Sequence, residues 1–189
     1  MNAVNKNVVK TGAIEMLWKV LIVVFIGWAL VDYNQTVNEE RLKRQSIELK
    51  EREKRCITDA LYHEARGEGE VGMLAVANVI HNRYNHPNYP DTYCGIINQH
   101  KQFSYTLEGK PQGEHLKAHL AFKPEKARNA YQTAEKIADD VVEGRLQKFL
   151  PSTVLWYTTT KVKNYWTKTK KVVVQIGNHK FYSDKEKKK

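Results

Sequence analysis

The chain has 189 residues, of which 41% are hydrophobic and 28% are charged. This length suits one globular domain with an extra segment at one end and argues against a multidomain protein. The formal net charge of +10 indicates an anionic partner, which nucleic acid, a membrane surface or an acidic wall polymer would each provide. The two cysteines, Cys56 and Cys94, lack the C-x-x-C spacing of zinc or redox sites, but one disulfide would suit an exported domain.

Residues 16–31 form the most apolar segment of the chain, MLWKVLIVVFIGWALV. Its uninterrupted apolar run covers only residues 20–31, which is shorter than the ~20 residues of a comfortable membrane span. Lys19 can extend toward the headgroups, so that the span becomes long enough. We therefore expect a transmembrane or signal-anchor helix over residues 16–32.

The charges around this segment predict its orientation. Asp32 follows the apolar run, and three lysines precede it: Lys6, Lys10 and Lys19. The positive-inside rule then places residues 1–15 in the cytoplasm and the rest of the chain outside it. No A-x-A-like cleavage site follows Val31, which favours an anchor, stable or able to leave the bilayer, over a cleaved signal peptide. A buried core helix is the remaining alternative, although the segment is apolar all round.

Residues 33–55 carry interleaved charges and few apolar side chains. Such a pattern predicts a solvated helical stalk, because one thin apolar stripe cannot bury itself in a core. A stalk-mediated coiled-coil dimer is a weak alternative, since fewer than about three heptads are available.

The remaining sequence predicts an α+β fold with a mainly helical lobe. Helical spacing extends over residues 56–66 and 71–84, and a third helix begins at Pro124 and ends at Gly144. From Lys171, a β-branched run, a Gly-Asn turn and a second short run predict a small C-terminal β-hairpin. We expect a single domain over residues 56–183, followed by a basic tail over residues 184–189.

The densest polar cluster, YHEARGEGE at residues 62–70, lies where a helix ends in glycines and a cleft can form. Glu64 lies on the apolar face of that helix. Partial burial would raise the pKa of this carboxyl toward the value that a general acid needs near neutral pH. The alternative is a structural ion pair with Arg66 or His63.

A zinc site is not expected here. His63 and Glu64 begin an H-E pair, but position 67 is Gly, so the H-E-x-x-H motif is absent. His81 and His86 are five residues apart across a helix end and are expected at the surface. We predict neither a metal nor another cofactor.

The C-terminal segment combines cations and aromatic rings, as nucleic-acid-binding surfaces do. The predicted export argues against nucleic acid, and outside the cytoplasm the same face would meet wall polymers, with its rings stacked on sugars. The residues concerned are Lys161, Lys163, Lys168, Lys170, Lys171, Lys180, Lys185, Lys187, Lys188 and Lys189, with Trp156, Tyr157, Tyr165 and Trp166.

Four sequence blocks occur in a diagnostic order: CITDALYHEARGE at 56–68, GMLAVANVIHNRYNHPNYPDTYCGIINQ at 72–99, QFSYT at 102–106 and IGNHKFY at 176–182. Together they resemble the cell-wall hydrolase family that includes the spore-cortex lytic enzyme SleB. The resemblance covers essentially the whole region after the stalk. It implies a lysozyme-superfamily-like domain that acts on peptidoglycan.

The resemblance implies that Glu64, in the Y-x-E-A-R-G-E block, is the catalytic acid/base. The implied reaction cleaves the β-1,4 bond between N-acetylmuramic acid and N-acetylglucosamine and leaves a 1,6-anhydro end, which needs one carboxyl and no water. A second carboxylate would permit hydrolysis instead. Glu68 and Glu70 are the only acids close in sequence.

Further residues receive roles by resemblance. The substrate-binding residues implied are Glu68, Gln102, Ser104, Tyr105 and Tyr157, of which Gln102 and Ser104 would bond the acetamido and hydroxyl groups. Glu68 has an alternative role in orienting Arg66, and Phe103 is expected in the core. Many relatives carry a His-Tyr-His-like segment near residue 157, whereas here only the tyrosine is present. Recurrence of the cysteines in relatives favours a Cys56–Cys94 disulfide.

The expected function is therefore that of a membrane-anchored muramidase or lytic transglycosylase, whose partners are peptidoglycan and the membrane and whose catalytic domain lies outside the cytoplasm. A phage endolysin and a host wall-remodelling enzyme are equally compatible. The alternatives are an amidase that cuts the stem peptide and a non-enzymatic basic module that binds wall or nucleic acid. On the predicted helices, Asn78 and Asn82 are expected to brace the glutamate helix.

Overall fold

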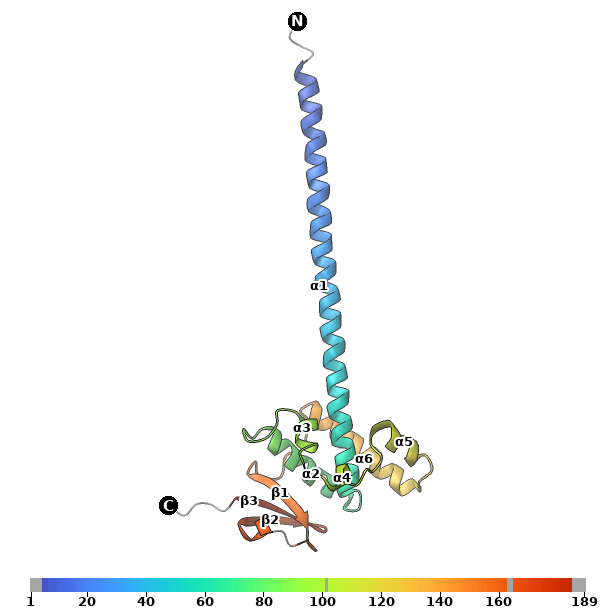
Figure 1. Ribbon diagram of the computed structural model, residues 1–189, viewed down its shortest axis with the longest axis vertical. Coiled ribbons are helices and arrows are strands. Elements are labelled where there is room, and N and C mark those ends of the chain that lie inside the picture. Colours follow the sequence, from blue (N-terminus) through green and yellow to red (C-terminus); the bar gives the residue numbers. More distant parts are fainter. Residues whose placement is uncertain (1–4, 101, 163–164, 185–189) are drawn as a thin grey trace, which may run out of the picture. The chain divides into compact units, whose positions relative to one another are not determined.

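The computed structural model describes residues 5–100, 102–162 and 165–184. Helix α1, Asn5–Ala65, continues without a break through the predicted anchor, the predicted stalk and the first predicted domain helix (Figure 1). By their internal contacts, the residues form two compact units, Met1–Glu48 and Leu49–Lys189. The extreme N-terminus assigned to the cytoplasm, 1–4, and the tail over 185–189 lie outside the described residues.

The first unit is helical, and its side chains from Glu15 to Glu48 are exposed. By length and composition, the helix over Glu15–Ala65 contains a stretch that is long and apolar enough to cross a membrane. Trp18 and Trp28 lie toward the two ends of this stretch and are more than half exposed.

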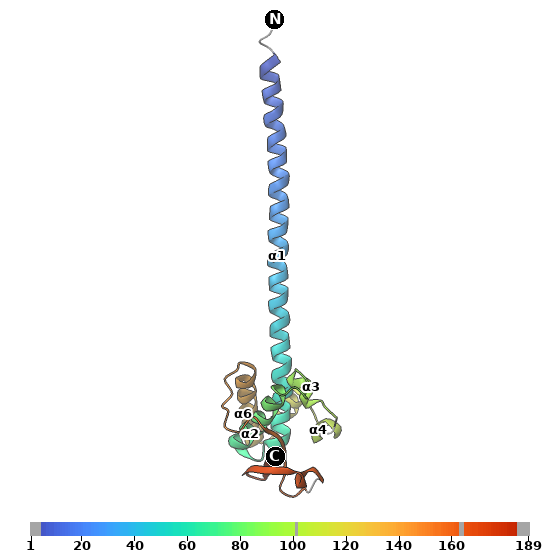
Figure 2. The ribbon, with the colours of Figure 1, turned by 90° about the vertical axis from the view of Figure 1, so that its left-hand side faces the viewer.

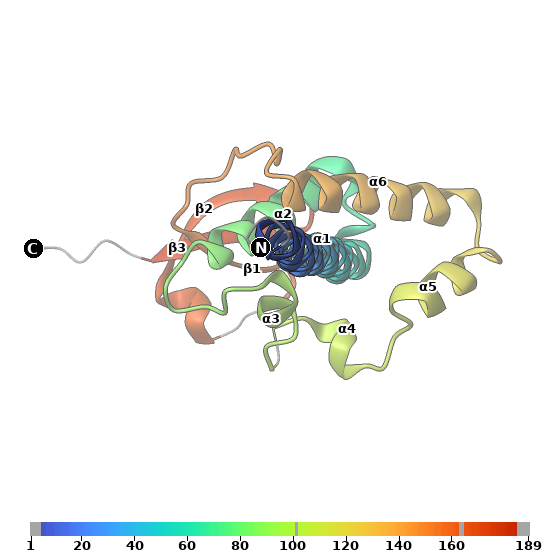
Figure 3. The same ribbon diagram turned by 90° about the horizontal axis from the view of Figure 1, so that it is seen from above.

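The helical part of the second unit is organised around α2, Gly69–Tyr84. Its residues Met73, Val76, Val79 and Ile80 are at most 1% exposed, and nearly every residue from Gly72 to Ile80 is buried, so α2 is the central helix of the unit. Helix α2 packs against α6 and against the first strand, and α5 leads into α6 at one side of the unit (Figure 3). The other helices are α3, Tyr93–Ile97; α4, Ser104–Leu107; α5, Gly113–Leu120; and α6, Glu125–Val142.

The strands form one three-stranded antiparallel sheet, β1-β3-β2, at the end of the second unit (Figure 2). The predicted hairpin is present as β2, Lys170–Ile176, and β3, His179–Asp184, joined at Gly177. Sequence reasoning missed the third strand, β1, Val154–Thr159, which pairs with the other edge of β3. A 3-10 turn, Tyr165–Lys168, lies in the connection between β1 and β2.

The end of α1 is fastened to the domain before the predicted boundary at residue 56. The Lys54 ammonium lies 2.9 Å from an Asp139 carboxylate oxygen on α6, and the buried Glu53 carboxylate accepts a hydrogen bond from the Cys94 N–H. Cys56 forms the expected disulfide with Cys94. Because exposed ion pairs contribute little, the disulfide and the buried apolar face hold this part of α1 most firmly.

Asn78 and Asn82 have a structural role that differs from the one expected. The Asn78 amide donates to the Gln147 carbonyl and accepts from the N–H groups of Phe149 and Leu150. The Asn82 amide donates to the carbonyls of Pro151 and Val154. Both residues therefore brace the segment that enters β1 and not the helix that carries Glu64.

Candidate active site

Glu64 lies in the last turn of α1, and its side chain is half-buried. The preceding turns are held in the core by Ile57 and Leu61, which are fully buried. The helix ends just beyond Glu64, and Gly69, the first residue of α2, adopts a positive φ of 70°. The carboxyl is thus presented at the end of a firmly packed helix.

Two opposing effects act on the Glu64 carboxyl. Burial raises its pKa, while hydrogen bonds from the Ser104 N–H and hydroxyl lower it. The Ser104 hydroxyl lies 3.4 Å from Glu64 Oε1. Burial is the larger effect, so the pKa remains above its ordinary value of 4.5. This direction suits a carboxyl that must carry a proton near neutral pH.

Glu64 opens into a cavity of about 690 Å³, a volume within the usual range for ligand sites. The walls come from α2, the segment around α4, and the sheet with its β1–β2 connection. Glu64 is the only carboxyl among the described residues that line the cavity. The lining residues are Glu64, Arg83, Gln102, Ser104, Leu107, Trp156, Tyr157, Thr158, Thr159, Val162, Tyr165, Trp166, Lys170 and His179.

Tyr157, on β1, is one of the predicted site residues that line this cavity. Its hydroxyl is buried and has no hydrogen-bond partner among the described residues. Burial raises the pKa of this phenol well above 10, and the nearby Glu64 carboxylate raises it further. The hydroxyl is therefore a proton donor that remains protonated beside Glu64.

Two cavity residues, Arg83 and His179, were missed by sequence reasoning. Arg83 belongs to α2 and is buried, and its Nε donates to the Leu155 carbonyl at 2.8 Å. The His179 ring on β3 lies 5.5 Å from the Tyr157 ring, and burial lowers the pKa of this imidazole. Both residues fall within the sequence blocks that carry the resemblance, which was the only signal available for them.

The QFSYT block contributes two of its three predicted binding residues. Gln102 and Ser104 line the cavity, whereas Tyr105 does not. Tyr105 is 1% exposed and stacks on the His63 ring, with the ring centroids 4.6 Å apart. Its assignment as a substrate-binding residue is therefore corrected to a core role. Phe103 is fully buried, as expected.

Glu68 is directed away from the cavity and toward the β2–β3 turn. Its Oε2 accepts the Asn178 N–H at 2.8 Å, and its Oε1 accepts the Asn178 side-chain amide at 3.1 Å. These bonds lower the pKa of Glu68. Glu68 does not line the cavity, and the expected contact with Arg66 is not among the described interactions, because Glu68 binds Asn178 and Arg66 lies over the Tyr62 ring.

The structural alternative for Glu64 was an ion pair with Arg66 or His63. Neither pair is among the ion pairs of the described residues. His63 Nε2 lies within hydrogen-bonding distance, 2.9 Å, of the Pro111 carbonyl oxygen. The described part of the chain also contains no group of three His, Cys, Asp or Glu side chains that could hold a metal ion.

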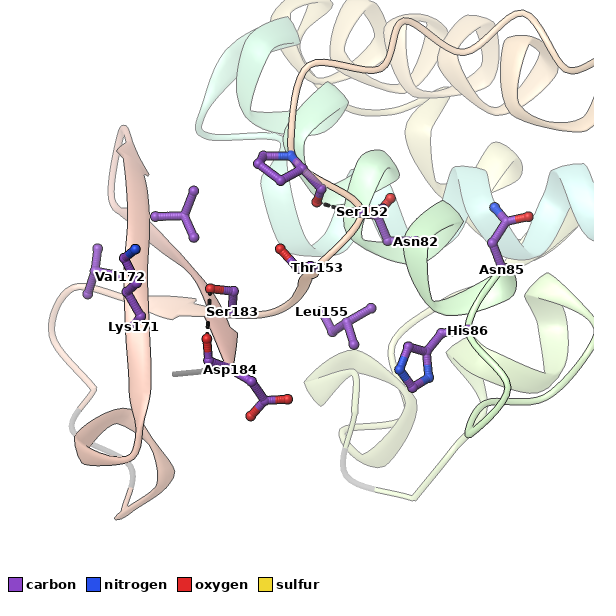
Figure 4. Close-up of a pocket in the computed structure, with 12 residues that line it drawn as sticks. Asn82, Asn85, His86, Ser152, Thr153, Leu155, Lys171, Val172, Ser183 and Asp184 are labelled. Atoms are coloured by element: carbon purple, nitrogen blue, oxygen red, sulfur yellow. Dashed lines mark hydrogen bonds between the residues drawn. The ribbon is translucent and has the colours of Figure 1, made fainter. Parts of the chain in front are cut away.

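A second cavity, of about 700 Å³, lies between α2 and the strands (Figure 4). On β1, Trp156 lines the first cavity and its neighbour Leu155 lines the second. On β2, Lys170 lines the first cavity and Lys171 the second. This division is expected, because successive side chains of a strand point to opposite faces. Glu64 and Tyr157 do not line the second cavity, so we place the candidate active site in the first.

Residues 67–182 match the family model described as Cell Wall Hydrolase, which is more than half of the chain. The chain belongs to this family. Glu64 itself precedes the matched range, so its role rests on the geometry above and on the resemblance of the block that contains it.

Within the cell-wall hydrolase family, two solved catalytic domains resemble the chain. One is the catalytic domain of the germination-specific lytic transglycosylase SleB from Bacillus anthracis, with a TM-score of 0.50 and 26% identity. The other is the catalytic domain of SleB from Bacillus cereus, with the same TM-score and identity. Both alignments cover 69% of this chain, and they cover 93% and 89% of the respective solved chains. The second unit therefore has the SleB catalytic-domain fold, mostly helical with a small sheet.

Curated relatives in the family include spore cortex-lytic enzymes. The enzyme of Oceanobacillus iheyensis is 32% identical over 126 residues, which are 66% of this chain and 39% of that protein. The enzyme of Halalkalibacterium halodurans is 44% identical over 54 residues, which are 29% of this chain and 16% of that protein. The chain thus spans well under half the length of these relatives.

Proposed function

We propose that this chain cleaves the glycan strands of peptidoglycan outside the cytoplasm, with Glu64 as general acid and then general base. The observation that carries the proposal is a half-buried carboxyl at the end of a rigid helix, in a cavity of about 690 Å³. The elevated pKa of Glu64 supports its first role, in which the group must hold a proton.

The proposed reaction needs only this carboxyl. Protonated Glu64 gives its proton to the oxygen of the β-1,4 bond, and the bond between that oxygen and the anomeric carbon of N-acetylmuramic acid breaks. The Glu64 carboxylate then removes the proton of the sugar's own 6-hydroxyl, whose oxygen bonds to the anomeric carbon. The net result transfers one proton between two sugar oxygens and leaves a 1,6-anhydro end.

The composition of the cavity supports this route over hydrolysis. A hydrolytic mechanism uses a second carboxylate at roughly 5 to 5.5 Å for retention or about 6.5 to 9.5 Å for inversion. Among the described residues, the lining contains no carboxyl besides Glu64, and Glu68 is bound to Asn178. A solved relative bears the name lytic transglycosylase, which points in the same direction.

The other cavity residues have roles in binding and proton control. Gln102 and Ser104 offer hydrogen bonds to acetamido and hydroxyl groups, and Tyr157 offers a buried hydroxyl beside Glu64. Tyr165 and Trp166 provide ring faces for the apolar faces of sugars, whereas the Lys170 ammonium lies 3.4 Å from the centre of the Trp156 ring. This arrangement fits the lysozyme-superfamily type of site inferred from the sequence.

We further propose that residues 16–32 anchor the enzyme in a membrane, with the catalytic unit on the outer side. The apolar stretch of α1, the lysines that precede it and the Cys56–Cys94 disulfide each support export. Peptidoglycan, the proposed substrate, lies on that side of the membrane.

The decisive experiment compares Glu64→Gln with wild type on purified peptidoglycan. Gln keeps the shape of the side chain but cannot titrate, so we expect the variant to bind sacculi and to lose turbidity clearing by at least about a hundredfold, as for loss of a general acid. Glu70→Gln is the matched control, because Glu70 is an exposed glutamate close in sequence that does not line the cavity.

Mass spectrometry of the released fragments identifies the chemistry. Anhydro-muramic ends support the proposed reaction, reducing ends would replace it with hydrolysis, and free stem peptides would replace it with amidase activity. Undiminished clearing by Glu64→Gln would refute the proposed role of Glu64.

A further inference from the structure

Arg83 combines deep burial with an unused hydrogen-bonding group in the wall of the cavity. The residue is 4% exposed. Its Nε donates to the Leu155 carbonyl, and its guanidinium carbon lies 5.4 Å from the centre of the Tyr89 ring. Its Nη1 has no hydrogen-bond partner among the described residues.

This arrangement leaves a positive charge without a counter-charge. None of the described ion pairs includes Arg83, and a backbone carbonyl and a ring face do not neutralise a guanidinium. A buried charge is costly unless it is paired, and an unused buried donor adds to that cost. The arginine is therefore preorganised for an oxygen acceptor that arrives with a ligand.

The neighbours of Arg83 place that acceptor close to the proposed reaction. Arg83, Tyr157 and Glu64 all line the same cavity. A sugar bound in this cavity therefore shares it with both Glu64 and Arg83.

The two sugars of the glycan strand differ in one such substituent. N-acetylmuramic acid carries a lactyl ether on carbon 3, two carbons from the anomeric carbon, whereas N-acetylglucosamine carries a hydroxyl there. The lactyl arm ends in a carboxylate when the stem peptide is absent and in an amide carbonyl when it is present. Both ends offer the oxygen acceptor that a guanidinium N–H binds.

We propose that Arg83 binds the lactyl arm of N-acetylmuramic acid through Nη1 and so determines which of the two sugars is cleaved. This inference rests on the proposed function and adds a specificity determinant to it. A free carboxylate pairs with the guanidinium charge, so strands without stem peptides bind more tightly to Arg83 than peptide-bearing strands.

The test measures binding in the Glu64→Gln background, so that cleavage does not interfere. Three ligands are compared: an N-acetylglucosamine hexamer, glycan strands freed of stem peptides, and peptide-bearing strands. Arg83→Gln removes the charge, and Arg83→Lys keeps the charge but removes the planar fork. Thermal unfolding of each variant sets a temperature at which all of them are folded.

Asn82→Ala is the matched control. Asn82 neighbours Arg83 on α2 and also bonds to carbonyls of the β1 region, but its side chain lies at the second cavity (Figure 4). The control therefore removes side-chain hydrogen bonds between α2 and the β1 region without changing a residue of the proposed site.

We expect Arg83→Gln to weaken binding of peptide-free strands by roughly ten- to a hundredfold, peptide-bearing strands less, and the hexamer not at all. Arg83→Lys recovers part of the loss for peptide-free strands alone. An equal loss for all ligands, a loss matched by Asn82→Ala, or no loss would overturn the inference. If the Glu64→Gln protein with Arg83 intact binds no glycan strand, the proposed function itself fails.

Discussion

The Ser104 hydroxyl on α4 lies 3.4 Å from Oε1 of Glu64 on α1, although the two residues are 40 positions apart in the sequence. The Ser104 N–H also interacts with this carboxyl. Both groups stabilise the carboxylate, while burial favours the protonated form. Ser104 thus offsets part of the effect of burial on the proposed catalytic group.

Ser104→Ala should raise the pKa of Glu64, because one donor to the carboxylate is removed and burial is unchanged. A general acid acts in its protonated form, so kcat/KM falls as pH rises through its pKa. We therefore expect the alkaline fall of kcat/KM to move to higher pH in Ser104→Ala, with a twofold to roughly tenfold lower maximum. Ser152→Ala, at the second cavity, is the control and should keep the wild-type profile. An alkaline limb shifted to lower pH would contradict this account.

Glu68→Ala should loosen the hairpin from the start of α2. The carboxylate accepts two hydrogen bonds from Asn178, and loss of hydrogen bonds to a charged group costs about 1.5–3 kcal/mol. Urea unfolding at pH 7 measures this decrease in the free energy of unfolding, and Glu70→Ala is the exposed control. Glu68 has a lowered pKa, so its contribution is complete above its ordinary value of 4.5 and is lost as pH falls through the folded-state pKa. A difference between variant and wild type that persists undiminished well below pH 4 would be inconsistent with this clamp.

Asp59→Asn should stabilise the domain at neutral pH. Burial raises the pKa of Asp59 from 3.8 to about 6, and its Oδ2 accepts the Gly113 N–H. The folded state therefore binds the proton more tightly than the unfolded state, so its stabilising contribution is present below pH 3.8 and is lost as pH rises to 6. Asn accepts the same hydrogen bond without a charge. We expect a gain on the order of 3 kcal/mol at pH 7 that shrinks toward zero at pH 4, measured by urea unfolding. Equal gains at the two pH values would show that ionisation is not the cause.

Replacement of both cysteines by serine should destabilise the catalytic unit. The Cys56–Cys94 bond closes a loop with a sequence separation of 38, for which the chain-entropy relation gives about 4 kcal/mol at 25 °C. Unfolding in urea with and without reductant measures this effect. Wild type should lose stability on reduction, whereas the double serine variant should not respond. A wild type that is indifferent to reductant would disprove a stabilising role for the bond.

The sequence predicted the helices over residues 56–66 and 71–84, the helix that is α6 and the C-terminal hairpin, and it indicated Glu64 as the principal site candidate, but it did not predict α3, α4 or α5. A β-branched run and a Gly-Asn turn predicted the β2–β3 hairpin, because this signal is contained within one short segment. Strand β1 was missed because its burial pattern does not alternate and its partner β3 follows only after a long connection. Helical period also predicted α2, but it did not separate a core face from an exposed face, because nearly every residue from Gly72 to Ile80 is buried while Val71 is exposed.

The errors at the site arose where a side chain's direction depends on distant partners. Glu68 follows a helix end, and its partner Asn178 is 110 residues away, so local sequence could not show its direction. Within QFSYT, one turn of α4 directs Ser104 to the cavity and Tyr105 to the core, and the motif alone does not distinguish them. The sequence around Arg83 did not distinguish it from an exposed polar residue near a helix end. Its burial depends on contact between α2 and β1, which the sequence did not predict.

The disulfide also couples folding of the catalytic unit to the redox state of its surroundings. Cys56 belongs to the same helix as Glu64, so the bond fastens the segment that presents the proposed catalytic group. In a reducing cytoplasm the bond would be absent, and a deficit of about 4 kcal/mol corresponds to a roughly thousandfold larger unfolded fraction. We expect the folded fraction of the catalytic unit to be larger under oxidising than under reducing conditions.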